Sequence, residues 1–512
     1  MAAMRRFDAN PQRWCYACAW LLLCWTVVPL TALADNAARY FESIKHDPVQ
    51  LRQFLQRFPK GGDLHNHLSG AVYAESYLAW AAEDGKCIDL QTNVISLPPC
   101  DATTPLRQLM ADASSTPLEP IIDALSVRNY ALRELSGHDQ FFATFSRFQS
   151  AALGRFGDMV AEARRRAGRQ NMVYLELMIS VGMLEVAQLA TAEGRLDAPF
   201  GERIDHAKVD AIVADVVAQF DAIEARQTAL LGCDEQAATA PLGCDVTVRF
   251  QAQVLRTFAP VQVYAQTLLA VKLIQADPRV VALNFVAPED HRTALRDYRQ
   301  HMLFVSELSS AFPSDPAGIT LHAGELTMGL VPPEDLGWHI RDAIDTAGAT
   351  RIGHGIDIAY DDNMQALLRT MAERDILVEI NLTSNDVILG VKDAAHPLPT
   401  YLAYGVPVTL STDDEGVSRI DLTHEYQRAT NTYDLDYQQL LYFARNSLQY
   451  SFLPGAALFE DTATAQASPV CATDELGSSD ASTACAQFLE QSPKAALQWD
   501  LERRLRAFSA RF

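Results

Sequence analysis

The sequence predicts an α/β protein, a (β/α)8 TIM barrel with an N-terminal helical segment, disulfide-bearing insertions and a C-terminal helix. Eight short β-type runs alternate with stretches of helical length, which is typical of parallel strands joined by crossover helices. Eight such units are the number that closes a barrel. An open doubly wound sheet is the competing topology, but it usually carries a glycine-rich turn after its first strand, and none is present here.

The eight predicted strands are residues 62–68, 172–179, 246–253, 280–286, 318–323, 350–354, 376–381 and 406–411. Three segments look like additions to the barrel: residues 87–120, 227–245 and 460–486. A helix is expected over residues 36–58, with Phe41, Ile44, Leu51 and Leu55 on its apolar face. A final helix is expected after Ser492, a good N-cap, with Pro493 at its first position.

The first 34 residues have the pattern of a signal peptide. Arg5, Arg6 and Arg13 precede an apolar run from about residue 14 to 30, which ends in Ala32-Leu33-Ala34. An uncleaved membrane anchor is the alternative, but Thr26 and Pro29 interrupt a run that is already short for a membrane span. We therefore expect export to the periplasm or the medium, with no stable membrane association after cleavage.

We accordingly divide the chain into a signal peptide (1–34), an N-terminal helical segment (35–58), a barrel (59–455) and a C-terminal extension (456–512). Six cysteines remain after cleavage and lie as neighbouring pairs in the three added segments: Cys87 and Cys100, Cys233 and Cys244, Cys471 and Cys485. Many connectivities are open to six cysteines. Export favours three local disulfides, and buried free thiols are the alternative.

Composition and charge exclude several classes of function. Of the 512 residues, 49% are hydrophobic and 21% charged, which is typical of a globular protein and excludes wholesale disorder. Lys and Arg number 42 against 64 Asp and Glu, for a formal net charge of −22. Such a surface repels phosphate backbones, so we expect no nucleic-acid partner.

Histidines and an aspartate follow the ends of four predicted strands. His65 and His67 are two apart in the first strand, so both side chains point to the same side of the sheet. His322, His354 and Asp413 end the fifth, sixth and eighth strands. Barrel active sites form at the carboxyl ends of the strands, and imidazoles with one carboxylate suit Zn²⁺. Each residue also has an ordinary structural interpretation, but four coincidences at one rim favour a metal site.

Four motifs together resemble the adenosine deaminase family: His65-x-His67, His322-Ala-Gly-Glu325, Gly353-His354-Gly355 and Thr412-Asp413-Asp414. The resemblance runs from about Pro59 to Pro454. The family is a zinc-dependent (β/α)8 barrel within the amidohydrolase superfamily. The Lys60-Gly61 lead-in and the exported, disulfide-bearing chain are most similar to the secreted adenosine deaminase-related proteins.

The resemblance implies one Zn²⁺ per chain, held by His65, His67, His322 and Asp413. The metal would lower the pKa of a water molecule and so supply hydroxide. His354 would orient that water and take up its proton, and Glu325 would protonate a purine ring nitrogen. Asp414 would bind another ring nitrogen. The implied reaction converts adenosine or 2′-deoxyadenosine to inosine or 2′-deoxyinosine and ammonia.

The candidate substrate-binding residues depart from the family at two positions. Ser69 stands where an acidic residue commonly contacts the ribose 5′-hydroxyl, and Ala287 stands where a glycine N–H usually meets the base. Asp414 is the third residue expected to touch the base. Phe141 and Phe142 match an aromatic gate over the purine, and ordinary helix core is the alternative.

These departures leave other functions open. The substrate is expected to be a small purine nucleoside, and another 6-aminopurine compound is the alternative. A non-catalytic binding protein on the same barrel and an exported peptidase or lactonase are further alternatives. The sequence does not decide whether the chain forms a homodimer.

Overall fold

A computed structural model describes residues 30–111, 118–132, 135–233, 241–315 and 318–512. Residues 1–29 of the predicted signal peptide lie outside this part, so the predicted cleavage stays a prediction. The first helix, α1 (Leu30–Ile44), begins within the last residues of that segment.

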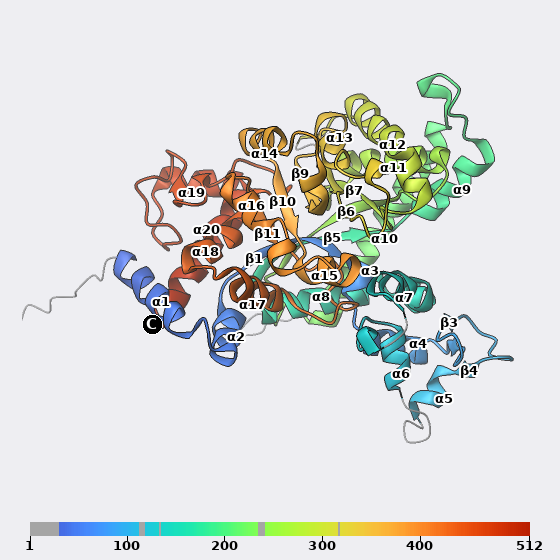
Figure 1. The fold of residues 1–512 in the computed structure, drawn as a ribbon, viewed down its shortest axis with the longest axis horizontal. Helices are drawn as coiled ribbons and strands as arrows, with labels where there is room; N and C mark the ends of the chain where they lie inside the picture. Colours follow the sequence, from blue (N-terminus) through green and yellow to red (C-terminus); the bar gives the residue numbers. More distant parts are fainter. Residues whose placement is uncertain (1–29, 112–117, 133–134, 234–240, 316–317) are drawn as a thin grey trace, which may run out of the picture.

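Eight parallel strands form the centre of the molecule (Figure 1). They pair as two four-stranded sheets, in the orders β1-β5-β6-β7 and β11-β10-β9-β8. Single bridges between Leu283 and Ile319 and between Asn66 and Asp413 join the two sheets. The predicted closed barrel is therefore confirmed, and its strands are β1 (Gly61–His67), β5 (Met172–Ile179), β6 (Thr247–Leu255), β7 (Val280–Val286), β8 (Thr320–Ala323), β9 (Arg351–His354), β10 (Leu377–Ile380) and β11 (Val408–Leu410).

Each of these strands overlaps one predicted run, although β1 begins one residue earlier and β6 ends two residues later than predicted. β5 and β7 are buried along their whole length, as expected for parallel strands covered by helices on the outer face. The helices that follow or flank the strands are α8 (Phe156–Arg169), α9 (Met183–Glu193), α10 (His206–Leu231), α11 (Pro260–Ala276), α12 (Arg292–Ala311), α13 (His339–Asp345), α14 (Met364–Glu373), α16 (Leu398–Ala403), α17 (Leu422–Tyr433) and α18 (Tyr437–Gln449).

Short elements build the loops between β1 and β5 and after β8 to β10. They include α3 (Leu68–Ala71), α4 (Ala74–Glu83), α7 (Gly137–Ala152) and α15 (Leu382–Leu389). The same loops contain the 3-10 helices η1 (Tyr130–Leu132), η3 (Pro333–Asp335), η4 (Ile356–Tyr360) and η5 (Asp393–Ala395), and η2 (Phe200–Glu202) lies between β5 and β6. α7 packs against α15, so the segment after β1 lies beside the segment after β10.

The prediction of one helix over residues 36–58 is wrong, because α1 ends at Ile44 and a second helix, α2 (Pro48–Arg57), begins after a break. Proline disfavours helical backbone in the residue before it. Asp47 is extended instead, and its carboxylate accepts the N–H groups of Val49 at 3.0 Å and Gln50 at 3.1 Å. The four predicted apolar residues are nevertheless all buried. Both helices lie beside the C-terminal helix α20 (Pro493–Ser509) (Figure 1).

The structure pairs the cysteines as predicted: Cys87 with Cys100, Cys233 with Cys244, and Cys471 with Cys485. The first added segment projects from the barrel in Figure 1 and consists of β2 (Cys87–Ile88), β3 (Ile95–Ser96), β4 (Thr104–Pro105), α5 (Leu106–Ala111) and α6 (Glu119–Ala124). The last one consists of β12 (Phe459–Asp461), β13 (Gln466–Ala467) and α19 (Thr483–Gln491). The start predicted for the second, residue 227, is wrong because α10 continues to Leu231.

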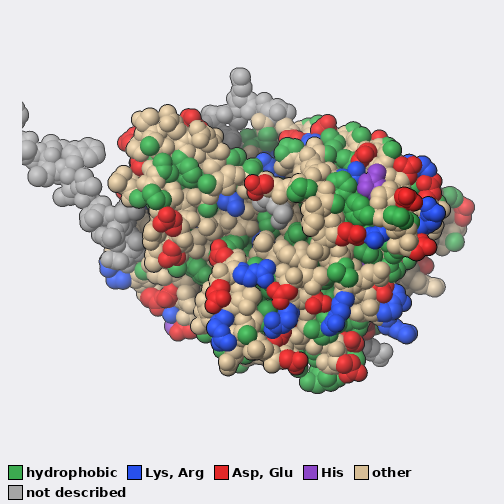
Figure 2. Space-filling view, turned by 90° about the horizontal axis from the view of Figure 1, so that it is seen from above, with side chains coloured by type: hydrophobic (Ala, Val, Ile, Leu, Met, Phe, Trp, Pro, Cys, Tyr) green, Lys and Arg blue, Asp and Glu red, His purple; other side chains and the backbone are tan. Residues whose placement is uncertain are grey.

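The predicted cap of the last helix is confirmed, since the Ser492 hydroxyl accepts the Ala495 N–H at 3.2 Å. Among the described residues, no helix has the length and apolar character needed to cross a membrane. Figure 2 shows acidic and basic side chains interspersed over one face of the molecule, with hydrophobic side chains scattered among them.

Candidate metal centre and active site

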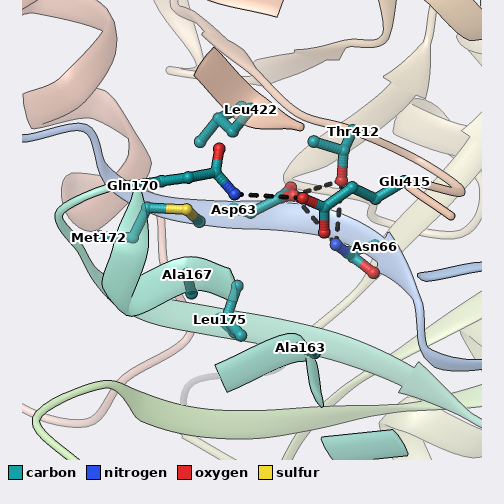
Figure 3. Close-up of a pocket in the computed structure, with 10 residues that line it drawn as sticks. All are labelled: Asp63, Asn66, Ala163, Ala167, Gln170, Met172, Leu175, Thr412, Glu415 and Leu422. Atoms are coloured by element: carbon teal, nitrogen blue, oxygen red, sulfur yellow. Dashed lines mark hydrogen bonds between the residues drawn. The ribbon is translucent and has the colours of Figure 1, made fainter. Parts of the chain in front are cut away.

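The alternation of β1 separates its two histidines from the residue between them. Asn66 points away from His65 and His67, and its Nδ2 donates to Thr412 Oγ1 at 2.9 Å and to Asp63 Oδ2 at 3.2 Å. Thr412 Oγ1 donates to the same Asp63 oxygen at 2.6 Å (Figure 3). Backbone bonds from His67 N to Asp413 O and from Asp413 N to His65 O close the barrel at this point. The seam of the barrel therefore fixes Asp413 beside the two histidines.

The four predicted metal ligands converge at the carboxyl end of the strands. Nε2 of His322 lies 3.0 Å from Nε2 of His65 and 3.1 Å from Nε2 of His67. Oδ1 of Asp413 lies 3.3 Å from each of the same two β1 nitrogens. Four ligands at about 2.0–2.1 Å from a tetrahedral zinc lie about 3.3–3.4 Å apart. The spacing of these donor atoms is close to that of a tetrahedral site.

The hydrogen bonds on the far side of two rings show why a cation fits among them. His65 Nδ1 lies 2.6 Å from Glu379 Oε2, which can only accept, so Nδ1 carries the proton. His322 Nδ1 lies 2.8 Å from Asn284 Oδ1, the oxygen that also accepts the His322 backbone N–H. When both rings are neutral, each presents a lone pair at Nε2, and two lone pairs 3.0 Å apart repel unless a cation or a proton lies between them.

The pKa values of the two rings shift in opposite directions in the metal-free cluster. Burial acts to lower the pKa of His65, but its bonds to Asp413 and Glu379 raise the pKa to about 10. Burial, together with the neighbouring histidines, holds the pKa of His322 well below its usual range. Carboxylate–histidine pairs of the Glu379–His65 kind orient metal ligands and raise their basicity.

His67 meets an amide whose orientation is not fixed. Its Nδ1 lies 2.9 Å from Nε2 of Gln253, and the other end of this amide accepts from the Ser180 hydroxyl. A hydroxyl both donates and accepts. The Gln253 amide can therefore turn and accept a proton from Nδ1, which leaves Nε2 free to bind a metal.

Two glycines let these side chains approach. A Cβ on Gly353 would lie 2.6 Å from Cε1 of His65, and a Cβ on Gly70 would lie 1.4 Å from Oδ1 of Asp414. Gly353 belongs to the Gly353-His354-Gly355 motif. Gly70 carried no sequence expectation, and a residue with a side chain there would displace Asp414.

Two further carboxyl groups sit beside Asp413 with the opposite protonation preference. Burial, reinforced by the Asp413 charge, raises the pKa of Glu325 well above its usual range and does the same for Asp414. The pKa of Asp413 is held well below its usual range by bonds to His65 and His67, which outweigh burial. Burial and charge thus favour the ionised form of Asp413 and the protonated form of its two neighbours. Oε1 of Glu325 and Oδ1 of Asp414 are buried without a hydrogen-bond partner among the described residues.

Glu289 holds the backbone that presents Glu325. Its two carboxylate oxygens accept the N–H groups of Gly324 at 3.1 Å and Glu325 at 2.9 Å. Nδ1 of His339 lies 3.1 Å from Oε1 of Glu289, and Arg256 lies 3.7 Å from Oε2. Glu289 is fully buried, so these contacts fix the loop after β8.

His354 is the last residue of β9 and has a left-handed backbone, with φ at 69°. Its Nδ1 lies 2.9 Å from Nδ2 of Asn385 and 3.5 Å from Oε1 of Glu325. Burial lowers the pKa of His354 to about 3. A nitrogen of this ring also lies within 4.8 Å of donor atoms of His65, His322 and Asp413. Proximity alone therefore does not separate it from the metal ligands.

The predicted substrate-binding residues differ in their exposure. Ser69 is half-buried in α3, and Ala287 follows β7 with a left-handed φ of 78°. Phe141 is buried in the main core, which agrees with the core interpretation of this residue. Phe142 is half-buried, and its ring centroid is 5.1 Å from that of Phe141. Only Phe142 of the pair keeps a surface that a substrate could touch.

The family model described as "Adenosine deaminase" matches residues 136–458. That match covers more than half of the chain and includes β5 to β11 with His322, Glu325, His354, Asp413 and Asp414. The chain belongs to the adenosine deaminase family.

Adenosine deaminase from Escherichia coli O1:K1 / APEC is 40% identical over 136 residues, which is 26% of this chain and 38% of that relative. The match thus spans well under half the length of the curated relative. The fold is shared with the crystal structure of arabidopsis N6-mAMP deaminase MAPDA (TM-score 0.51, 17% identity, 78% of this chain and 96% of that one). It is also shared with arabidopsis ADAL complexed with GMP (TM-score 0.51, 18% identity, 78% and 94%).

Sequence reasoning missed the residues that orient the predicted site: Asn284, Glu289, Glu379, Asn385 and His396. One signal was present in the sequence, since Asn284 and Glu379 are polar residues inside otherwise apolar strands. A buried polar group needs a partner, so each could have been marked as a contact to some functional residue. Which residue it contacts depends on the register of the barrel.

Proposed function

We propose that the protein is a zinc-dependent aminohydrolase that converts adenosine and 2′-deoxyadenosine to inosine and 2′-deoxyinosine with release of ammonia. The proposal rests on two kinds of functional group, metal ligands and protonated carboxyls, that lie together at one rim of the barrel. Four distances of 3.0–3.3 Å link the donor atoms of the predicted ligands and suit one Zn²⁺, and two buried carboxyls with raised pKa lie beside them. The second pair favours a purine substrate over a peptide or a lactone, because a purine offers two ring nitrogens for these groups to bind.

A zinc ion bound by His65, His67, His322 and Asp413 would lower the pKa of a water molecule and make hydroxide available near neutral pH. Glu325, protonated because it is buried beside Asp413, donates to a purine ring nitrogen and makes the adjacent C6 electrophilic. Asp414 binds a second ring nitrogen and fixes the base. Water adds at C6, the C6–N6 bond breaks, and ammonia leaves.

The other 6-aminopurine compounds are the second candidate class. Ser69 and Ala287 support it, because they stand where the family usually contacts the sugar and the base. Ala287 carries a methyl group on a left-handed backbone, which narrows the space at the end of β7. A panel of adenosine, 2′-deoxyadenosine, adenine and 5′-methylthioadenosine would separate the two classes.

The test is an ultraviolet assay of adenosine conversion to inosine by the purified protein. Activity should vanish after dialysis against a chelator and return with zinc. The Glu325→Gln variant, purified in parallel, controls for deaminase carried over from an expression host. No conversion of any 6-aminopurine by zinc-loaded protein would contradict the proposal and favour a binding role on the same barrel.

The three disulfides also support export, because such bonds persist mainly in oxidising compartments. We expect the protein in the periplasmic or extracellular fraction of its source cells. Recovery only from the cytoplasm, with free thiols at all six cysteines, would contradict this.

A further inference from the structure

A chain of three hydrogen bonds begins at a backbone amide and ends at Nδ1 of His354. The Leu398 N–H donates to His396 Nδ1 at 3.1 Å. His396 Nε2 lies 3.1 Å from Asn385 Oδ1, and Asn385 Nδ2 lies 2.9 Å from His354 Nδ1. Asn385 is fully buried and His396 nearly so.

The direction of every bond in this chain follows from its first member. A backbone N–H can only donate, so His396 Nδ1 accepts and its proton lies on Nε2. That proton needs an acceptor, so the end of the Asn385 amide that faces His396 is its oxygen. The other end, the NH₂ group, must then donate to His354. Burial, with the charge of Arg428, lowers the pKa of His396 to about 3, in keeping with a neutral ring.

We propose that this chain holds His354 as the tautomer with a lone pair on Nδ1 and the proton on Nε2. His354 therefore acts in the proposed deamination as a hydrogen-bond donor from Nε2, and Asn385 and His396 are its positioning residues. The inference rests on the proposed function for its catalytic meaning. It differs from the role expected from the family resemblance, in which His354 takes up the proton of the water.

One competing contact exists on the same nitrogen. Glu325 Oε1 lies 3.5 Å from His354 Nδ1 and would favour a proton there if it were ionised. The Asn385 NH₂ group is closer, at 2.9 Å, and its hydrogen would collide with a second hydrogen on Nδ1. Nε2 of His354 is buried with no partner among the described residues, so its proton is left to bind a water or substrate oxygen.

The direct test reads the tautomer by NMR. Zinc-loaded protein carrying ¹⁵N-histidine would be measured in long-range ¹H–¹⁵N correlation spectra, with the His354 signals assigned by their loss in His354→Asn. We expect a pyridine-type Nδ1 and a pyrrole-type Nε2 in the parent. A pyrrole-type Nδ1, or protons on both nitrogens, would overturn the inference.

Two isosteric variants test the direction of the chain. Asn385→Asp still accepts from His396 but offers His354 an acceptor, so the His354 proton should move to Nδ1. Asn385→Leu keeps a similar side-chain volume but offers His354 neither a donor nor an acceptor, so His354 should be a mixture of tautomers. In the aspartate variant kcat should fall by about 10²- to 10⁴-fold with little change in KM, the order of loss that follows a misplaced catalytic proton. Metal content of both variants should match the parent.

The tautomer measurement separates failure of this inference from failure of the proposed function. The NMR result needs no turnover, so it decides the tautomer even if the protein deaminates nothing. Conversely, an active enzyme whose His354 proton lies on Nδ1 would leave the deaminase proposal intact and overturn the inferred direction of the hydrogen bonds. If an Asn385 variant does not fold, the spectrum of the parent protein still identifies the tautomer of His354.

Discussion

Two kinds of histidine meet at the rim of this barrel. His65 and His322 lie within regular strands, and each directs Nδ1 at a group that accepts: Glu379 for His65 and Asn284 for His322. His354 ends its strand with a left-handed backbone and directs Nδ1 at an amide that donates. The outer contact of a histidine therefore decides which inner nitrogen is free to bind a metal. Whether a histidine at such a site is a metal ligand therefore depends on what its outer nitrogen contacts as much as on its position.

The largest expected effect is a difference in zinc content between variants of the two kinds of histidine. His322→Ala should purify with little zinc and no deaminase activity, because one of three imidazoles is lost. His354→Ala should keep about one zinc per chain and still lose activity. Elemental analysis checks both variants. Equal loss of metal from the two would place His354 among the ligands and abolish the distinction.

Glu325→Gln removes a proton donor and leaves every predicted ligand in place. Activity on adenosine should fall by about 10²- to 10⁴-fold, the range that general acid catalysis contributes. The metal content should match the parent. Steady-state kinetics beside elemental analysis provide the check, and near-parental turnover would show that the proton comes from another group.

The acceptor behind His322 can be tested with a matched pair. Asn284→Leu removes the oxygen that holds Nδ1–H, whereas Asn284→Asp keeps an acceptor there. Loss of such an outer contact typically weakens metal binding 10- to 100-fold. Zinc affinity measured by competition with a chelator should show that loss for leucine and a smaller change for aspartate. Equal affinities in the two variants would mean that the oxygen does not orient His322.

The smallest expected effect concerns backbone strain at the rim. His354, Asp413 and Ala287 all have left-handed φ angles, at 69°, 61° and 78°. For His354 and Asp413 the strain presents a functional side chain, but Ala287 offers only a methyl group. Ala287→Gly should therefore raise the free energy of unfolding by up to about 1 kcal/mol, because glycine adopts this conformation without strain. Thermal denaturation measures it, and a lower midpoint would show that the methyl contributes packing.

Much of the architecture could be predicted from local pattern. Each of the eight strands overlaps a predicted run, and the Ser492 cap and the three cysteine pairs agree with the structure. The N-terminal helix was predicted in one piece because its apolar residues continue across the break. The Asp47-Pro48 pair at the start of α2 is a local signal of this break.

The candidate site was partly predictable for a geometric reason. The i, i+2 spacing of His65 and His67 sets both on one side of β1, and closure of the barrel brings His322 and Asp413 to them. The contacts behind the rings were not predictable, because His65 and Glu379 are 314 residues apart in the chain. Their meeting depends on strand register across the barrel, which no local pattern contains.

By itself the sequence determined the barrel, the residue types at its rim and the cysteine pairs, because periodicity and spacing act over a few residues. Only the tertiary structure decided which groups lie behind the rings of His65, His322 and His354 and which carboxyl pKa values are raised or lowered. Hydrogen-bond direction and burial are properties of the assembled neighbourhood, and the residues that create them come from strands far apart in the chain.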